Sequence, residues 1–190
     1  KEETPAVNGQ DIMVSLDIKL QDTVEQALAE GVKDLETEEG SSIVMDAATG
    51  EIYAACSLPY MNPADMSSSQ VGSESVKAIT QAYEPGSTFK PIVMAAALEE
   101  GVIDDESTFY CGGSTEIGGW TIRCSNRSGH GTQTTRRALM NSCNMAMIQI
   151  AQKLGGEKFY EYWENFGFTS TTGIELPGEV KSYFWNKDYF

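Results

Sequence analysis

The sequence predicts an α+β fold, in which one N-terminal β-hairpin from an incomplete antiparallel sheet packs on a mainly helical remainder. Residues 42–46 and 51–56 are short runs of β-forming side chains, and Gly50 in the turn between them can take a positive φ. Residues 89–100 are apolar nearly all round, which is typical of a buried central helix. Because a two-stranded hairpin is not stable alone, either it packs on the helices or the rest of its sheet lies outside this chain.

The N-terminal elements are predicted from apolar spacing and end signals. The chain starts with the polar segment Lys1-Glu-Glu-Thr-Pro5, and residues 1–14 are expected to be a linker. Residues 17–30 have helical spacing, with Asp17 or Asp22 as the cap and Gly31 as the end. The segments expected next are an acidic loop at 36–40, the hairpin, a loop at 59–75 and a short helix at 76–82.

The C-terminal part is expected to be helical after the central helix. Pro91 lacks an N–H group and so belongs in the first turn, which places the start of the central helix near Ser87. The glycine-rich residues 108–131 are expected to be irregular or short-stranded. Three further helices are expected at 134–140, at about 144–154 and at 157–166.

Composition narrows the classes of function. The chain has 190 residues, enough for one domain or one and a half, with 41% hydrophobic and 22% charged residues. The net charge of −15 predicts a soluble surface, and the lack of a basic stripe argues against nucleic-acid binding. No apolar run is long enough to span a membrane.

Ser87 and Lys90 form the only Ser-x-x-Lys in the chain. A Pro-Gly turn precedes them and the apolar helix follows, so both side chains are expected on one face of a helix start. A neutral amine within hydrogen-bond reach can take the proton of a serine hydroxyl and make it a nucleophile. The pair therefore suggests acyl transfer through a serine ester, although chance alone would supply roughly one such spacing in a chain of this composition.

Ser142-Cys-Asn144 is the only Ser-x-Asn in the chain, at a break between two expected helices. Such a junction can present a hydroxyl and an amide to a cleft. The alternative is that Ser142 only caps the following helix, which is a common role for serine. Taken alone, the segment favours the cap.

The four cysteines and the single histidine give no metal-binding pattern. Cys56, Cys111, Cys124 and Cys143 include no C-x-x-C pair, and a zinc site needs at least three converging ligands. We therefore expect no metal and no cofactor, with His130 ordering a loop. Cys111 and Cys124 flank a glycine-rich loop and could be bridged in an oxidising compartment or remain free.

Five segments, in their order and spacing, resemble the transpeptidase domain of penicillin-binding proteins, most closely the class B, monofunctional, high-molecular-weight members. The resemblance runs from about Gly9 to Gly178, and Ser142 follows Ser87 by 55 positions (142 − 87 = 55). It implies a penicillin-binding protein/β-lactamase-like fold, with residues 15–190 as a partial transpeptidase domain. The segments are Ser15-Leu-Asp-Ile-Lys-Leu-Gln21, Val44-Met-Asp-Ala-Ala-Thr-Gly-Glu-Ile-Tyr53, Glu84-Pro-Gly-Ser-Thr-Phe-Lys-Pro91, Gly129-His-Gly131 and Ser142-Cys-Asn144.

The resemblance implies a reaction and a role for each site residue. Ser87 would attack the carbonyl of a peptidoglycan stem peptide that ends in D-Ala-D-Ala, or the lactam carbonyl of a penicillin. Lys90 would be the base, Ser142 would relay a proton to the leaving group, and Asn144 would bind the substrate amide. The partners are then stem peptides and β-lactams, with division or elongation proteins possible. The expected place is the extracytoplasmic face of a bacterial membrane, reached through an N-terminal anchor outside this chain.

The sequence departs from the family at its third motif, a Lys-Thr-Gly or Lys-Ser-Gly box on a strand beside the cleft. In the family this box binds the substrate carboxylate, and its strand supplies one oxyanion donor. Neither tripeptide occurs here, and Lys181-Ser-Tyr183 lacks the glycine. The chain is therefore expected to stop before that strand, losing three strands of a five-stranded sheet, and to show little activity and poor β-lactam binding alone.

Two other functions remain open. A class D β-lactamase or a β-lactam sensor also resembles this Ser-Thr-Phe-Lys segment, but such proteins have Ser-x-Val as the second box, so Asn144 favours the penicillin-binding protein. The other alternative is a non-catalytic scaffold module. Rapid turnover of a penicillin would favour the first alternative, and full function after Ser87→Ala would favour the second.

Overall fold

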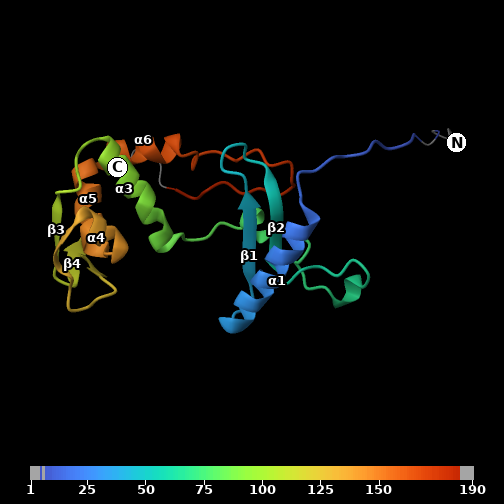
Figure 1. The fold of residues 1–190 in the computed structure, drawn as a ribbon, viewed down its shortest axis with the longest axis horizontal. Coiled ribbons are helices and arrows are strands. Elements are labelled where there is room, and N and C mark those ends of the chain that lie inside the picture. The colour runs from blue at the N-terminus through green and yellow to red at the C-terminus, as the bar shows by residue number, and fades with distance from the viewer. Residues whose placement is uncertain (1–4, 6, 185–190) are drawn as a thin grey trace. The chain divides into compact units, whose positions relative to one another are not determined.

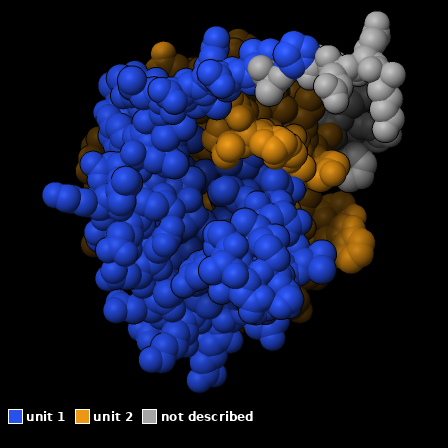
Figure 2. All heavy atoms as spheres, turned by 90° about the vertical axis from the view of Figure 1, so that its right-hand side faces the viewer, with its two compact units in different colours: residues 1–81 blue, residues 82–190 orange. Residues whose placement is uncertain are grey.

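The computed structural model describes residue 5 and residues 7–184 (Figure 1). The chain divides into two compact units, residues 1–81 and residues 82–190, which Figure 2 colours blue and orange. Residues 5 and 7–17 form no helix or strand, and the rest of the expected linker lies outside the described residues. No helix among the described residues combines the length and the apolar character that a membrane crossing requires.

The first unit begins with helix α1 (Ile18–Asp34), whose cap is Asp17. The Asp17 carboxylate accepts hydrogen bonds from the N–H groups of Lys19 and Leu20 at 2.9 Å, which satisfies two donors that the helix leaves free. The prediction that Gly31 ends this helix is wrong. The helix continues for another turn because that turn packs on the hairpin, and a Cβ atom at Gly40 would collide with Val32.

The predicted hairpin is confirmed. Strands β1 (Gly40–Met45) and β2 (Ile52–Leu58) pair antiparallel, and Gly50 in the turn has φ 80°. The Gln21 side chain of α1 hydrogen-bonds both backbone groups of Ala55 at 2.9 and 3.0 Å, so the helix is fastened to β2 by polar contacts as well as by packing. Among the described residues this sheet has two strands, and α1 supplies the packing that two strands alone lack.

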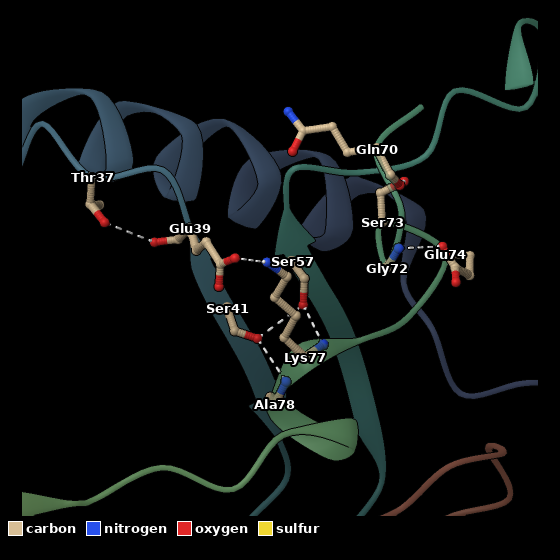
Figure 3. A network of polar contacts seen from close by, with 10 residues as sticks. All are labelled: Thr37, Glu39, Ser41, Ser57, Gln70, Gly72, Ser73, Glu74, Lys77 and Ala78. Atoms are coloured by element: carbon tan, nitrogen blue, oxygen red, sulfur yellow. Dashed lines mark hydrogen bonds and ion pairs between the residues drawn. The ribbon is translucent and has the colours of Figure 1, made fainter. Parts of the chain in front are cut away.

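A short helix, α2 (Lys77–Thr80), closes the first unit and takes its N-terminal partners from the hairpin. Ser57 Oγ accepts from the Lys77 N–H at 2.8 Å, and Ser41 Oγ accepts from the Ala78 N–H at 2.9 Å. The two hydroxyls lie 3.0 Å apart, and the Lys77 ammonium pairs with Glu39 at 2.8 Å (Figure 3). The two strand serines thus accept from the free N–H groups at the start of α2. Val76, the residue at the N-cap position, has no side-chain oxygen to accept them.

The loop before α2 contains one short 3-10 turn, η1 (Met66–Ser68). The predicted loop at 59–75 and the predicted short helix at 76–82 are otherwise confirmed.

The second unit holds the predicted helices. The 3-10 turn η2 (Gly86–Phe89) leads into α3 (Lys90–Glu99), with Pro91 in the first turn as predicted. The other helices are α4 (Thr135–Met140), α5 (Asn144–Leu154) and α6 (Gly156–Asn165). Helix α3 is less buried than its composition predicts, because Leu98 is 44% exposed while Val93, Met94, Ala96 and Ala97 are buried.

Two small antiparallel sheets accompany these helices. Strand β3 (Thr108–Cys111) pairs with β6 (Gly131–Thr134), and β4 (Ser114–Ile117) pairs with β5 (Trp120–Arg123). The prediction that residues 108–131 are irregular or short-stranded is confirmed, but it does not extend to residues 132 and 133, and Thr134, expected at the start of a helix, ends β6. The pairing of β3 with β6 is non-local, so local propensity does not show it.

The core of the second unit lies where α3 and α5 meet the β3–β6 sheet. Phe109 and Ile150 are its largest fully buried side chains. Three of the four cysteines belong to the same cluster. The buried members are Val93, Met94, Ala97, Ile103, Phe109, Cys111, Cys124, Ala138, Cys143, Met145, Ala146, Met147 and Ile150.

Candidate active site

Ser87 lies in the η2 turn, directly before α3. Gly86 precedes it with φ 57°, a backbone conformation that favours glycine, so the Pro-Gly entry is needed to make the turn. The Thr88 hydroxyl donates to the Pro85 carbonyl at 2.6 Å and closes the turn. Ser87 is exposed, and no group among the described residues hydrogen-bonds its hydroxyl. The hydroxyl is therefore open to a reactant.

Phe89 anchors this turn to the aromatic side chains of the C-terminal region. Its ring lies 5.2 Å from that of Trp163, 5.6 Å from Phe168 and 6.1 Å from Phe159, measured between centroids. Aromatic pairs in tilted and edge arrangements at such distances are stabilising. These contacts fasten the start of α3 to aromatic side chains of α6 and the residues that follow it.

Ser142 lies at the junction between α4 and α5 in a left-handed conformation, with φ 47°. The N–H of Ser142 donates to the Leu139 carbonyl and that of Cys143 to the Ala138 carbonyl, the pair of bonds that ends a helix in a Schellman motif. Glycine is the usual residue at this position, and a side chain there costs on the order of 1 kcal/mol. A serine at this strained position is a candidate for a functional side chain.

Lys90 reaches across to this junction with its ammonium. Its Nζ atom donates to the Ser142 carbonyl at 2.6 Å, to Ser142 Oγ at 3.0 Å and to Asn144 Oδ1 at 2.6 Å. An ammonium has three donors, so all three have partners. Lys90 thereby joins the first predicted motif to the second, 52 and 54 positions further along.

Asn144 is the first residue of α5, and both ends of its amide are used. Its oxygen accepts from Lys90, and its Nδ2 donates to the Arg123 carbonyl at 2.9 Å. The amide therefore holds Lys90 from one side and is itself fixed by the end of β5. The sequence could not predict that the Arg123 carbonyl supports the site, because every residue has a backbone carbonyl and the residue type does not mark this one.

The environment of Lys90 lowers the pKa of its ammonium. Burial lowers the pKa of its ammonium, and the nearby Cys124 and Cys143 oppose this when they are ionised; the net direction is downward. A lysine must be neutral to accept a proton. The site thus combines an open serine hydroxyl, an amine one turn later with a lowered pKa, and a second hydroxyl 3.0 Å from that amine.

The sequence-predicted residues therefore form one site only in part. Lys90, Ser142 and Asn144 are in direct contact. Ser87 is joined to Lys90 through the backbone, because the Lys90 N–H donates to the Ser87 carbonyl, and not through its hydroxyl. The alternative that Ser142 caps α5 does not apply, since the cap residue is Cys143 and no side chain caps that helix.

The expectation that the cysteines and histidine do not converge is wrong. Cys111, Cys124, Cys143 and His130 place one ligand atom each within 4.8 Å of one another, beside the Ser142–Asn144 junction. All four cysteines are free in the structure, so Cys111 and Cys124 are not bridged in it. Burial raises the pKa of the Cys124 thiol, but backbone N–H groups of Asn144 and Asn126 and the neighbouring thiols outweigh it and lower the pKa to about 6.

Comparison with known proteins identifies the family. Residues 40–189 match the model of the penicillin binding protein transpeptidase domain. Stage V sporulation protein D of Bacillus subtilis (strain 168) is 37% identical over 179 residues, which cover 93% of this chain and 28% of that protein. Peptidoglycan D,D-transpeptidase FtsI of Escherichia coli (strain K12) is 29% identical over 168 residues, covering 88% of this chain and 28% of that protein.

A solved structure agrees with this. The crystal structure named as a peptidoglycan glycosyltransferase from Atopobium parvulum DSM 20469 superimposes with a TM-score of 0.87 at 34% identity, covering 98% of this chain and 44% of that chain. The chain therefore belongs to the penicillin-binding protein transpeptidase domain family. The resemblance and the α+β fold inferred from the sequence are confirmed. The chain spans less than a third of the length of either curated relative.

Proposed function

We propose that this chain carries the nucleophile and proton-transfer groups of a serine peptidoglycan D,D-transpeptidase. One observation supports this most strongly: Lys90, one turn after an open Ser87 hydroxyl, is held by Ser142 and Asn144 through three hydrogen bonds. Family membership and the D,D-transpeptidase name of one relative support the same class of reaction.

In the proposed reaction Ser87 Oγ forms a bond to the penultimate D-Ala carbonyl carbon of a stem peptide. Neutral Lys90 takes the hydroxyl proton, and the N–H of Ser87, at the start of a helical turn, faces the developing oxyanion. Collapse breaks the C–N bond, and the proton passes through the Ser142 hydroxyl to the departing D-Ala amine. The amine of a second stem peptide then displaces Ser87 and forms the cross-link. A β-lactam would acylate Ser87 in the same way, and its ring opens instead of losing an amine.

We further propose that full activity needs a strand with a Lys-Thr-Gly or Lys-Ser-Gly box, which this sequence does not contain. Such a strand would bind the substrate carboxylate and complete the oxyanion donors. The proposed domain is residues 15–190, preceded by a linker at 1–14. Peptidoglycan stem peptides and β-lactams are the proposed ligands, and the extracytoplasmic face of a bacterial membrane is the proposed location, with contacts to division or elongation proteins.

The contact between Asn144 and Lys90 favours this proposal over a class D β-lactamase or sensor. An amide oxygen at this position accepts from the ammonium at 2.6 Å, which the valine of a Ser-x-Val box cannot do. The same contact supports a catalytic site over a scaffold module, because a half-buried ammonium loses hydration that three fixed partners must replace, and a scaffold has no need of such a group.

Labelling with a fluorescent penicillin tests the proposal in a form of the protein that includes a Lys-Thr-Gly or Lys-Ser-Gly strand. We expect stoichiometric labelling of the unchanged protein and of Thr121→Ala, which removes an exposed hydroxyl in β5. Ser87→Ala should lose the label completely, and the isolated chain should label weakly. Labelling of Ser87→Ala to the level of Thr121→Ala would refute the assignment.

A further inference from the structure

Four potential metal ligands meet inside the second unit, from four separate segments. Cys111 ends β3, Cys124 follows β5, His130 precedes β6, and Cys143 is the cap residue of α5. The three cysteines are nearly inaccessible, at 1%, 2% and 0% exposure, and the histidine is half-buried. Three thiols and an imidazole in one buried cluster are a complete ligand set for a four-coordinate metal.

The distances fit a tetrahedral ion. Zinc–sulfur bonds of about 2.3 Å and zinc–nitrogen bonds of about 2.0 Å place two sulfurs roughly 3.8 Å apart and a sulfur and a nitrogen roughly 3.5 Å apart. The observed separations are 3.9 Å between the sulfurs of Cys124 and Cys143, and 3.6 Å between the sulfur of Cys124 and His130 Nδ1. All four atoms lie within 4.8 Å of one another, so an ion can reach each of them with small adjustments.

The backbone around the cluster is built for close approach. Gly113 and Gly129 both have a positive φ, 92° and 80°. A Cβ atom at Gly113 would collide with the carbonyl oxygen of Arg127, and one at Gly129 with that of Cys111. The loop that carries His130 therefore lies directly against the end of β3, and only glycine permits this.

We propose that Cys111, Cys124, Cys143 and His130, through Nδ1, bind one structural zinc ion. Soft thiolate ligands select zinc over magnesium or calcium, which prefer oxygen. Four protein ligands leave no open position, so the ion has a structural role and does not take part in the chemistry. Binding releases the protons of the coordinating thiols to solvent.

The site also has a consequence for the proposed active site, and this part rests on the proposed function. Cys143 stands between Ser142 and Asn144, the two residues that hold Lys90. A metal bound to Cys143 would fasten this junction to β3 and to the end of β5. The zinc would thus fix the position of the Lys90 partners, without touching the substrate.

Metal content and cobalt substitution test the proposal with the 190-residue chain, prepared under reducing conditions. We expect one zinc per chain by elemental mass spectrometry. Cobalt should replace zinc and give intense tetrahedral d–d bands with thiolate-to-cobalt charge transfer. Cys56→Ser is the matched control, because Cys56 is also a buried free cysteine but lies in β2 of the other unit, and this variant should keep the full metal content.

Variants at His130 keep the test independent of folding. His130→Ala should lower zinc affinity by more than about 100-fold, beyond the range typical of supporting residues, whereas His130→Cys should retain one zinc with stronger charge transfer in the cobalt form. The proposal is overturned if the reduced chain with supplied zinc stays metal-free. It is also overturned if His130→Ala leaves the cobalt spectrum unchanged, or if Cys124 and Cys143 form a disulfide in zinc-treated protein.

These readouts do not depend on acylation. If the form with a Lys-Thr-Gly or Lys-Ser-Gly strand binds zinc but is never acylated, the proposed function is refuted and the metal site stands. If that same form labels at Ser87 but stays metal-free, the metal site is refuted and the proposed function stands.

Discussion

The α4–α5 junction has two different sides. On one side, Ser142 and Asn144 offer oxygen atoms to the Lys90 ammonium at 2.6 to 3.0 Å. On the other side, Cys143 between them offers sulfur to a largely buried cluster of thiols and an imidazole. We call Lys90, Ser142 and Asn144 the polar centre. The thiol centre is the set Cys111, Cys124, His130 and Cys143. Three consecutive residues, 142–144, thus contribute to both centres.

The difference shows how one segment can place reactive groups on one side and groups that hold the structure on the other. The polar centre contains groups that can exchange protons, and the exposed Ser87 beside it can meet a substrate. The thiol centre contains a cysteine whose pKa is lowered to about 6, yet that side chain is only 2% exposed. A good nucleophile without access is suited to holding a metal, whereas a weaker nucleophile with access and a base is suited to catalysis.

The largest expected effect comes from changing the base of the polar centre. Lys90→Arg keeps the positive charge but cannot become neutral, so the rate of penicillin acylation should fall by roughly 10²- to 10⁴-fold. With Lys90 in place the rate should rise with pH as the ammonium loses its proton. Because burial lowers its pKa, the midpoint should lie below the usual lysine value of about 10.4.

The measurement is the acylation rate with a fluorescent penicillin across pH, in the form with the third motif. Lys153→Arg in the last turn of α5 is the control and should leave the profile unchanged. A midpoint at or above the usual lysine value, or full activity of Lys90→Arg, would show that Lys90 is not the base.

A smaller effect is expected from the glycines that build the thiol centre. Gly129→Ala should lower zinc affinity by about 10- to 100-fold, because its Cβ would push the His130 loop away from Cys111. Gly119→Ala is a matched control: its φ of 82° is nearly the same as the 80° of Gly129, but nothing lies within 4 Å of the added atom. Competition with a chromogenic chelator measures both affinities, and equal losses in the two variants would contradict the close-packing argument.

The smallest effect concerns the strain at Ser142. Ser142→Gly and Ser142→Ala both remove the hydroxyl, but only glycine relieves the positive φ of 47°. We expect Ser142→Gly to be more stable than Ser142→Ala by about 1 kcal/mol in urea unfolding, with both slow in acylation. If the alanine variant is equally stable, the serine is not strained and its backbone carries no functional information.

The polar centre could be found from the sequence because each of its motifs is contiguous. Ser87 and Lys90 are one turn apart, and Ser142 and Asn144 flank a break between two periodic segments. The sequence could not show that the Asn144 amide hydrogen-bonds both Lys90 and the Arg123 carbonyl, because the second bond depends on where β5 ends.

The thiol centre escaped prediction because its ligands are spread over four segments. Cys111 is far from the other ligands in the sequence. The pairing of β3 with β6 brings it close to them in space, because it places Cys111 opposite Gly131, the neighbour of His130. That pairing was itself missed, since residues 131–134 have no strand pattern of their own. Non-local pairing therefore hid both the small sheet and the metal-ligand cluster.

The local elements were predicted best where a cap or a turn residue fixed them. Gly50 makes the hairpin turn as predicted, and the helices expected at 134–140 and at about 144–154 are present, where Thr134 caps α4 through its hydroxyl and Gly155 follows α5. Gly31 misled because a glycine can lie inside a helix whose last turn gains from tertiary packing. Hydrophobicity alone also overstated the burial of α3, since Leu98 faces outward.

The most direct test of this account is to locate the acyl group. The protein, in a form with a Lys-Thr-Gly or Lys-Ser-Gly strand, would be treated with benzylpenicillin, digested, and its peptides sequenced by tandem mass spectrometry. We predict a single ester adduct on Ser87, with Cys111, Cys124 and Cys143 unmodified. An adduct on Ser142, or a thioester on Cys124, would contradict the division of the junction into a reactive polar centre and a closed thiol centre.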